Sequence, residues 1–73
     1  MATDMPPHLL VAHEFMAQRS YGDVEPMYVE RVDNDHLWYV DYELDEGSLT
    51  LEVSWEAGRG WAVVVWDFHR RGI

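Results

Sequence analysis

Three short connectors divide residues 27–68 into four segments, and this division constrains the fold more than any other feature of the chain. The connectors, residues 33–36, 45–48 and 57–60, contain the Asp, Asn, Gly and Ser residues that tight hairpin turns require. Between them, apolar and polar residues alternate, which is typical of β-strands with one buried face. We therefore expect strands at residues 27–32, 37–44, 49–56 and 61–68.

The expected turns determine which residues face each other across the sheet. If residues 34–35, 46–47 and 58–59 are two-residue turns, counting outward from them pairs apolar residues with apolar residues on one face. The expected pairs are Trp38 with Trp55, Val40 with Val53, Tyr42 with Leu51, Leu44 with Leu49, Val53 with Val64, Leu51 with Trp66, and Leu49 with Phe68. Turn chemistry and alternation agree, so we predict a four-stranded antiparallel meander with this face buried.

A helical stretch precedes the strands. Residues 8–20 follow Pro6 and Pro7, and proline is tolerated in the first turn of a helix. Gly22 is a suitable C-terminal cap. The apolar stripe of this helix consists of Leu9, Ala12, Phe15 and Met16. The predicted fold class is α+β, with one N-terminal helix packed on a four-stranded antiparallel β-meander. We expect residues 1–7 to form a flexible N-terminal segment and residues 8–73 a single small domain.

The same counting assigns residues to the opposite face of the sheet, where a binding site would have to lie. Six carboxylates are expected on this face: Glu30, Asp41, Glu43, Glu52, Glu56 and Asp67. Five apolar residues are expected beside them: Tyr28, Tyr39, Trp61, Val63 and Val65. In the first hairpin Glu30 faces Tyr39 and Tyr28 faces Asp41. In the second, Asp41 is expected directly opposite Glu52, and such an opposition of like charges destabilises a sheet.

The charge of the chain indicates the kind of partner. It carries 14 Asp and Glu residues against five Arg and no Lys, and its formal net charge is −9. Four Trp, four Tyr and two Phe are too many for a disordered acidic tail, so the acid must cover a folded surface. Such a surface attracts basic proteins, and we expect no direct binding to nucleic acid or membranes. Salt adaptation or a GC-rich genome would also produce acidity without Lys, with solvation as its only role.

The sequence offers little chemistry for a metal, a cofactor or catalysis. His8 and His13 are five residues apart, which misses the i, i+4 spacing of a helical zinc site, and there is no cysteine. Residues 33–35 lack the glycine and the distal glutamate of a calcium loop. Asp41 and Glu52 could form an acid–base pair, but an open sheet face offers no cleft. We therefore expect no enzyme activity and no cofactor, and in the absence of a signal peptide or membrane span we expect a cytoplasmic protein.

Two functions of different classes fit this sequence. The first is a small non-catalytic inhibitor that imitates nucleic acid and occupies the basic nucleic-acid-binding surface of another protein. Carboxylates two positions apart on a strand are separated by about 6.7 Å, which is close to the spacing of phosphates along a nucleic-acid strand. Phage-encoded anti-defence proteins, including anti-CRISPRs and uracil-glycosylase inhibitors, are similar in size and charge.

The second function is that of an acidic homodimeric accessory or antitoxin-like module, whose charge serves only solubility or salt adaptation. Residues 61–66 are apolar on both faces of an expected edge strand. They lack the Lys, Pro or inward charge that usually protects an edge. A second copy of the chain or a partner protein would cover this strand, with Trp61, Val63 and Val65 in the interface.

Overall fold

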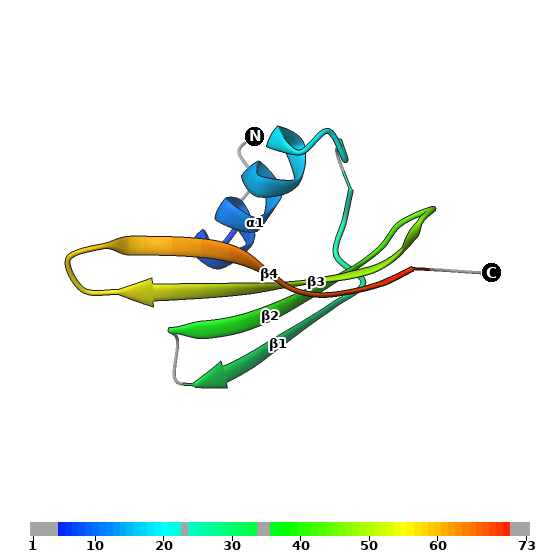
Figure 1. The fold of residues 1–73 in the computed structure, drawn as a ribbon. Helices are drawn as coiled ribbons and strands as arrows, with labels where there is room; N and C mark the ends of the chain where they lie inside the picture. The colour runs from blue at the N-terminus through cyan, green and yellow to red at the C-terminus, as the bar shows by residue number, and fades with distance from the viewer. Residues whose placement is uncertain (1–4, 23, 34–35, 71–73) are drawn as a thin grey trace.

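Figure 1 shows one helix lying on one side of a four-stranded antiparallel sheet. The computed structural model describes residues 5–22, 24–33 and 36–70. The strands lie in the order β1-β2-β3-β4, and each pairs antiparallel with the next. The elements are α1 (Pro7–Gln18), β1 (Tyr28–Asp33), β2 (Leu37–Glu43), β3 (Gly47–Glu56) and β4 (Gly60–Arg70). The predicted α+β fold, a helix packed on a β-meander, is confirmed.

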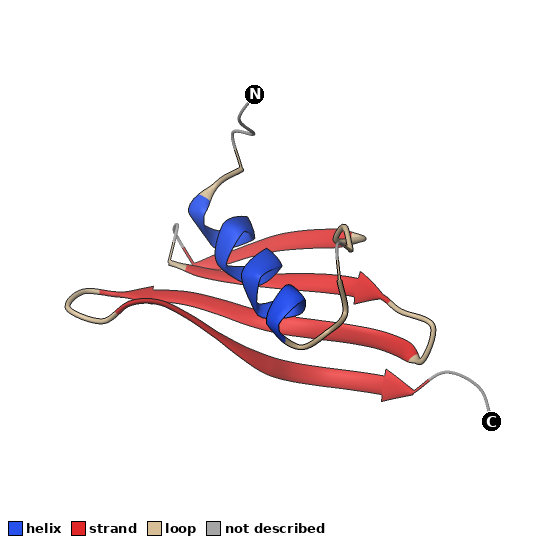
Figure 2. Ribbon diagram, turned by 90° about the horizontal axis from the view of Figure 1, so that it is seen from above, coloured by secondary structure: helices blue, strands red, loops and turns tan. Residues whose placement is uncertain are grey.

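Helix α1 crosses one face of the sheet obliquely (Figure 2) and packs against β2, β3 and β4. It begins at Pro7, where the missing N–H of proline is not needed for a helical hydrogen bond. His8, in the first turn, is buried, and its ring stacks on Trp38 with the ring centroids 3.6 Å apart. Among the residues that the structure describes, no helix is both long enough and apolar enough to cross a membrane.

The helix ends through a different residue from the one predicted. Ser20 adopts the left-handed conformation, with φ of 69°. The Tyr21 N–H donates to the carbonyl of Met16 at 3.0 Å, and the Ser20 N–H donates to the carbonyl of Ala17 at 3.2 Å. These two bonds form a Schellman motif, which satisfies carbonyls of the last helical turn. Gly22, the predicted cap, also has a positive φ, but it lies in the loop beyond the motif.

The core lies between α1 and the helix-facing side of the sheet. Alternate residues of β2 and β3 are buried there, as the two-residue period of a strand requires. The buried apolar side chains are Ala12, Met16, Val40, Tyr42, Leu44, Leu49, Leu51 and Val53. On β2 and β3, the face predicted to be buried is therefore the face that α1 covers.

The predicted register of the first hairpin is confirmed from Tyr28 to Arg31, but a shift before Asp33 places Asp33 opposite Leu37, where a turn at residues 34–35 would have placed Val32. Tyr28 lies opposite Asp41 and Glu30 opposite Tyr39, as predicted, although the expected turn at residues 34–35 lies outside the described residues.

The second hairpin is shifted by two residues, because Val40 lies opposite Leu51 and not Val53. Leu44 and Gly47 exchange both backbone hydrogen bonds, at 2.8 and 3.2 Å, so the two-residue turn consists of residues 45–46. A shift of two leaves every side chain on its predicted face.

The third hairpin differs from its prediction by one residue. Glu56 lies opposite Gly60, so residues 57–59 form a three-residue loop instead of a two-residue turn. Gly58 and Gly60 have φ of 87° and 83°, a conformation that glycine adopts without strain. A shift of one residue moves each following side chain to the opposite face. Val53 consequently lies opposite Val63 and not Val64.

A second irregularity in the same pair of strands cancels this shift. Leu51 lies opposite Val65, but its neighbour Thr50 lies opposite Asp67, which leaves Trp66 as the extra residue of a β-bulge. Beyond the bulge, Leu49 lies opposite Phe68, as predicted.

Candidate functional site

Figure 1 shows that α1 covers one side of the sheet only. The opposite side carries six carboxylates, and we call it the acidic face. They are Glu30 of β1, Asp41 and Glu43 of β2, Glu52 and Glu56 of β3, and Asp67 of β4, all on the face where the sequence placed them. No described arginine lies on this face. Arg31 and Arg70 lie opposite Trp38 and Gly47 on the helix-facing side, and Arg19 follows α1. Arg59 lies in the 57–59 loop, from which its guanidinium forms an exposed ion pair with Glu56 at 3.4 Å, and Nε2 of His69 lies 2.8 Å from Oδ2 of Asp67.

Hydroxyl groups hold two of these carboxylates. Thr50 Oγ1 donates a hydrogen bond to Asp41 Oδ1 at 2.6 Å, and Ser48 Oγ donates to Glu43 Oε1 at 3.0 Å. Both donors are the direct cross-strand neighbours of their acceptors. Hydrogen bonds to an ionised acceptor are stronger than neutral ones, so both carboxylates are oriented before any partner binds.

The predicted opposition of Asp41 and Glu52 is wrong. In the observed register Asp41 faces Thr50, and Glu52 faces Tyr39. A carboxylate–hydroxyl contact therefore replaces the expected contact between like charges, and the destabilisation inferred from the sequence does not arise there. Asp41 and Glu52 are also not the directly opposed acid–base pair that the sequence suggested.

Tyr39 lies between two carboxylates in one row across the sheet. Glu30 on β1 and Glu52 on β3 are its partners. Desolvation, and then the negative charges of Glu52 and Glu30, raise the pKa of Tyr39 above its ordinary value of 10.0. The phenol therefore keeps its proton at neutral pH and can donate a hydrogen bond from the middle of the acidic face.

Trp66 stands beside Tyr39, and we call these two residues the aromatic pair. Their ring centroids are 5.1 Å apart and their planes are tilted by 55°. The exposed fraction of Trp66 is 59%, which leaves a large apolar surface facing solvent among the carboxylates. The one-residue shift from the 57–59 loop places Trp66 on this face, and the β-bulge that follows brings Asp67 onto the same face beside it.

Three of the five predicted apolar site residues lie on the helix-facing side instead. Trp61 and Val63 pair with Trp55 and Val53 and pack against the core, and Val65 pairs with the buried Leu51. The three-residue loop at 57–59 is the cause, since it moves each of them by one position. Val64 and Trp66, which the sequence reasoning did not place there, occupy the acidic face. Tyr28 and Tyr39 lie on it as predicted.

The hydrogen bond between Thr50 and Asp41 gives a first prediction. Replacing Thr50 with Val keeps the shape of the side chain but removes the donor from a part-buried carboxylate. We expect the free energy of unfolding to fall by about 1–3 kcal/mol. Thr50→Ser keeps the hydroxyl and should lose less, and urea unfolding of both variants measures the difference. Equal losses for Val and Ser would show that the hydrogen bond contributes nothing.

A second prediction concerns alkaline pH. Burial raises the pKa of Tyr42 above 10.0, so the folded chain holds this proton more tightly than the unfolded chain. The stability that this provides is complete below pH 10.0, the unfolded value, and is lost as the pH rises through the higher folded pKa. Urea unfolding at increasing alkaline pH should show the loss, and Tyr42→Phe should reduce its slope. An unchanged slope in Tyr42→Phe would contradict the prediction.

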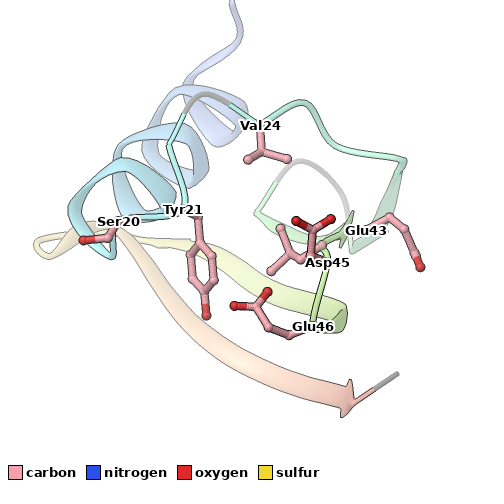
Figure 3. Close-up of a pocket in the computed structure, with 7 residues that line it drawn as sticks. Ser20, Tyr21, Val24, Glu43, Asp45 and Glu46 are labelled. Carbon is pink, nitrogen blue, oxygen red and sulfur yellow. The ribbon is translucent and has the colours of Figure 1, made fainter. Parts of the chain in front are cut away.

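Figure 3 shows a cavity between the loop after α1 and the β2–β3 turn. Its volume is about 320 Å³, and it is lined by Ser20, Tyr21, Val24, Glu43, Leu44, Asp45 and Glu46. Glu43 points away from the other lining side chains in this view, consistent with its bond to Ser48. Within residues 5–22, 24–33 and 36–70, no three metal-ligating side chains come together.

No protein-family model, curated protein or solved structure is significantly similar to this chain. The fold and the acidic face alone define its class, which is a small acidic α+β domain with a candidate binding site on the open side of its sheet.

Proposed function

We propose that this protein is a non-catalytic binding protein whose acidic face occupies a basic, nucleic-acid-binding surface of another protein and thereby inhibits it. The composition of the acidic face is the observation that carries the proposal. Six carboxylates share the face with the exposed aromatic pair, and among the described arginines only Arg59, which reaches Glu56 from the 57–59 loop, pairs with one of them in an ion pair.

The spacing of the carboxylates supports contact with groups that bind phosphates. Asp41 and Glu43 are two positions apart on one strand, which separates them by about 6.7 Å. Glu30, Glu52 and Asp67 lie on the neighbouring strands, which are spaced about 4.8 Å apart, so the charges are spread in two dimensions across the face. Thr50 and Ser48 hold two members of the array in place, which reduces the ordering needed when a partner binds.

The aromatic pair favours arginine over lysine in the partner. A guanidinium group can stack on the face of a Trp or Tyr ring while it forms two parallel hydrogen bonds to a carboxylate. Trp66 lies beside Tyr39, and Tyr39 lies between Glu30 and Glu52, so both kinds of group are close together. A central aromatic anchor surrounded by charge is the usual anatomy of a protein interface.

An arginine-rich peptide bound to a labelled single-stranded RNA provides a direct test. We expect the protein to compete for the peptide and release the RNA, and we expect added salt to weaken this competition because the contacts are largely electrostatic. When the RNA is bound to a lysine-rich peptide of equal length instead, the protein should release less of it. Failure to release the RNA from either peptide at low salt would overturn the proposal. A nuclease with an arginine-rich groove should in turn be inhibited, and excess substrate should relieve the inhibition.

Trp66 is the residue of the aromatic pair to replace first, which gives a third prediction. We expect Trp66→Ala to weaken binding of the arginine-rich peptide about thirtyfold, the loss of about 2 kcal/mol that is typical of a central anchor. Trp55→Ala is the matched control, because Trp55 is also exposed, by 37%, but pairs with Trp61 on the helix-facing side. Fluorescence anisotropy of a labelled peptide measures both affinities. Equal losses in the two variants would contradict a specific role for Trp66.

A further inference from the structure

Strand β4 carries a histidine on the acidic face, next to one of the six carboxylates. Nε2 of His69 lies 2.8 Å from Oδ2 of Asp67, which precedes it by two positions on the same strand. Residues two positions apart on a strand point to the same face. Across the sheet, His69 lies opposite Ser48, whose hydroxyl donates to Glu43. His69 therefore belongs to the acidic face, at the end where Asp67 and Glu43 lie.

The other three histidines of the chain lie elsewhere. His8 and His13 are part of α1, which covers the opposite side of the sheet. The ring of His36 contacts Trp55 on the helix-facing side, with the ring centroids 5.2 Å apart. Histidine is the type of side chain that ordinarily changes its charge between about pH 5 and about pH 8. Among the described residues, His69 is therefore the one through which such a change would act on the acidic face.

Asp67 is the carboxylate that directly follows Trp66, and the β-bulge leaves both side chains on the acidic face. A guanidinium group stacked on the exposed Trp66 ring thus has Asp67 as an immediate partner for hydrogen bonding. Oδ1 of Asp67 accepts the Phe68 N–H at 2.9 Å, and Oδ2 is the oxygen that His69 contacts. The imidazole and an incoming arginine therefore compete for the same carboxylate.

The charge of His69 determines how strongly it competes. A neutral ring with its proton on Nε2 donates an ordinary hydrogen bond to Asp67, whereas the bond from an imidazolium to a carboxylate is stronger because both groups are charged. The imidazolium also cancels the negative charge of Asp67 and repels a cationic partner. The ion pair of Arg59 with Glu56 differs in this respect, because arginine keeps its proton throughout this pH range.

The charged groups that face His69 from the neighbouring strands are carboxylates, within the part of the chain that the structure describes. Its cross-strand neighbour on β3 is uncharged, and beyond that neighbour Glu43 and Asp41 lie on β2. Arg70 lies on the helix-facing side, and residues 45–46 line the cavity of Figure 3. Aspartic and glutamic acids ordinarily titrate near pH 4, so histidine accounts for the change of charge between about pH 5 and about pH 8.

We propose that His69 makes binding at the acidic face sensitive to pH. Its imidazolium holds Asp67 and disfavours an arginine-rich partner, whereas the neutral ring yields the carboxylate to the partner. This regulation rests on the function proposed above, since it concerns binding at the same face. Protonation and partner binding oppose each other, and because such coupling is reciprocal, a bound partner in turn favours the neutral ring.

Calorimetric titration with the arginine-rich peptide at about pH 7.5 and about pH 5.5 tests this regulation. The peptide, capped at both ends, keeps the same charge at both values. The wild-type affinity should fall about fivefold at the lower pH, which is the upper value for one exposed charge pair. His69→Gln removes the titrating ring and should lose less than about twofold. His36→Gln is the matched control, because it removes an exposed histidine from the helix-facing side and should show the wild-type loss.

The possible outcomes separate this regulation from the proposed function. A peptide that does not bind at about pH 7.5 would overturn the proposed function and the regulation with it. Equal wild-type affinities at the two pH values would overturn the regulation alone, as would a loss in His69→Gln equal to that of the wild type. Titrations at about pH 6, in two buffers with different enthalpies of ionisation, count the protons released on binding. We expect fewer protons released from His69→Gln than from the wild type, and equal numbers would also overturn the regulation.

Discussion

Replacing Glu30, Glu43 and Glu52 together with Gln should weaken binding of the arginine-rich peptide about a hundredfold, at about 1 kcal/mol for each charge pair lost. These three carboxylates lie on three different strands of the acidic face, and Glu30 and Glu52 flank Tyr39. Glutamine keeps the size of the side chain and an acceptor oxygen, so the sheet should be little affected. Calorimetric titration at about 0.1 M salt, where the Debye length is about 10 Å, measures the change, and the dependence of affinity on salt should become weaker in the variant.

The control for this prediction changes the same amount of charge elsewhere. Glu14, Glu25 and Glu46 lie on α1, in the loop before β1 and in the β2–β3 turn, and all three are exposed. Their joint replacement with Gln alters the net charge equally but leaves the acidic face intact. We expect this triple variant to lose less than about tenfold in affinity, because exposed charges beyond a Debye length are largely screened. Equal losses in the two triple variants would mean that total charge alone attracts the peptide, which contradicts the proposed site.

The fold and the positions of the five carboxylates on β1 to β3 could be predicted from the sequence, because both depend on the period of the strands. Asp67 lies on its predicted face only because the bulge at Trp66 cancels the shift introduced by the 57–59 loop. Alternation along β2 and β3 identifies the buried face whatever the register, and a shift of two residues leaves that face unchanged. The shift itself was not predictable from turn composition. Residues 45–48 contain an acidic pair, a glycine and a serine, and a two-residue turn can be built at either of two positions in this segment. The two-residue shift changed only which residues pair across β2 and β3. For this reason Asp41 was expected opposite Glu52 but lies opposite Thr50.

On strand β4 the sequence pattern could not predict which residues lie on which face of the sheet. Residues 61–66 are all apolar, so alternation could not reveal a shift of one residue, and a shift of one residue reverses the faces. One signal was present in the turn, since Gly58 and Gly60 flank Arg59 and both adopt positive φ in the three-residue loop. The bulge at Trp66, by contrast, leaves no trace in the sequence, because it depends on how β4 pairs with β3. The aromatic pair is therefore a feature that only the structure reveals.

Replacing Leu51 with Ala should lower the free energy of unfolding by about 2–5 kcal/mol, the range for a buried leucine whose cavity does not collapse. Leu51 is fully buried on β3, between Val40 and Val65, in the cluster that includes Ala12 and Met16 of α1. The total stability of a 73-residue chain is about 4–11 kcal/mol, so the substitution removes a large part of it. Urea unfolding followed by circular dichroism should show a lower midpoint or, if the stability is near the lower value, an unfolded chain at room temperature.

Leu10 on α1 provides the matched control for this substitution. It is the same residue type, but it is exposed by 46% and is not part of the core cluster. Leu10→Ala should therefore change the free energy of unfolding by no more than about 0.5 kcal/mol, since alanine also has the highest helix propensity. If Leu51→Ala were tolerated as well as Leu10→Ala, the core would not lie between α1 and β3.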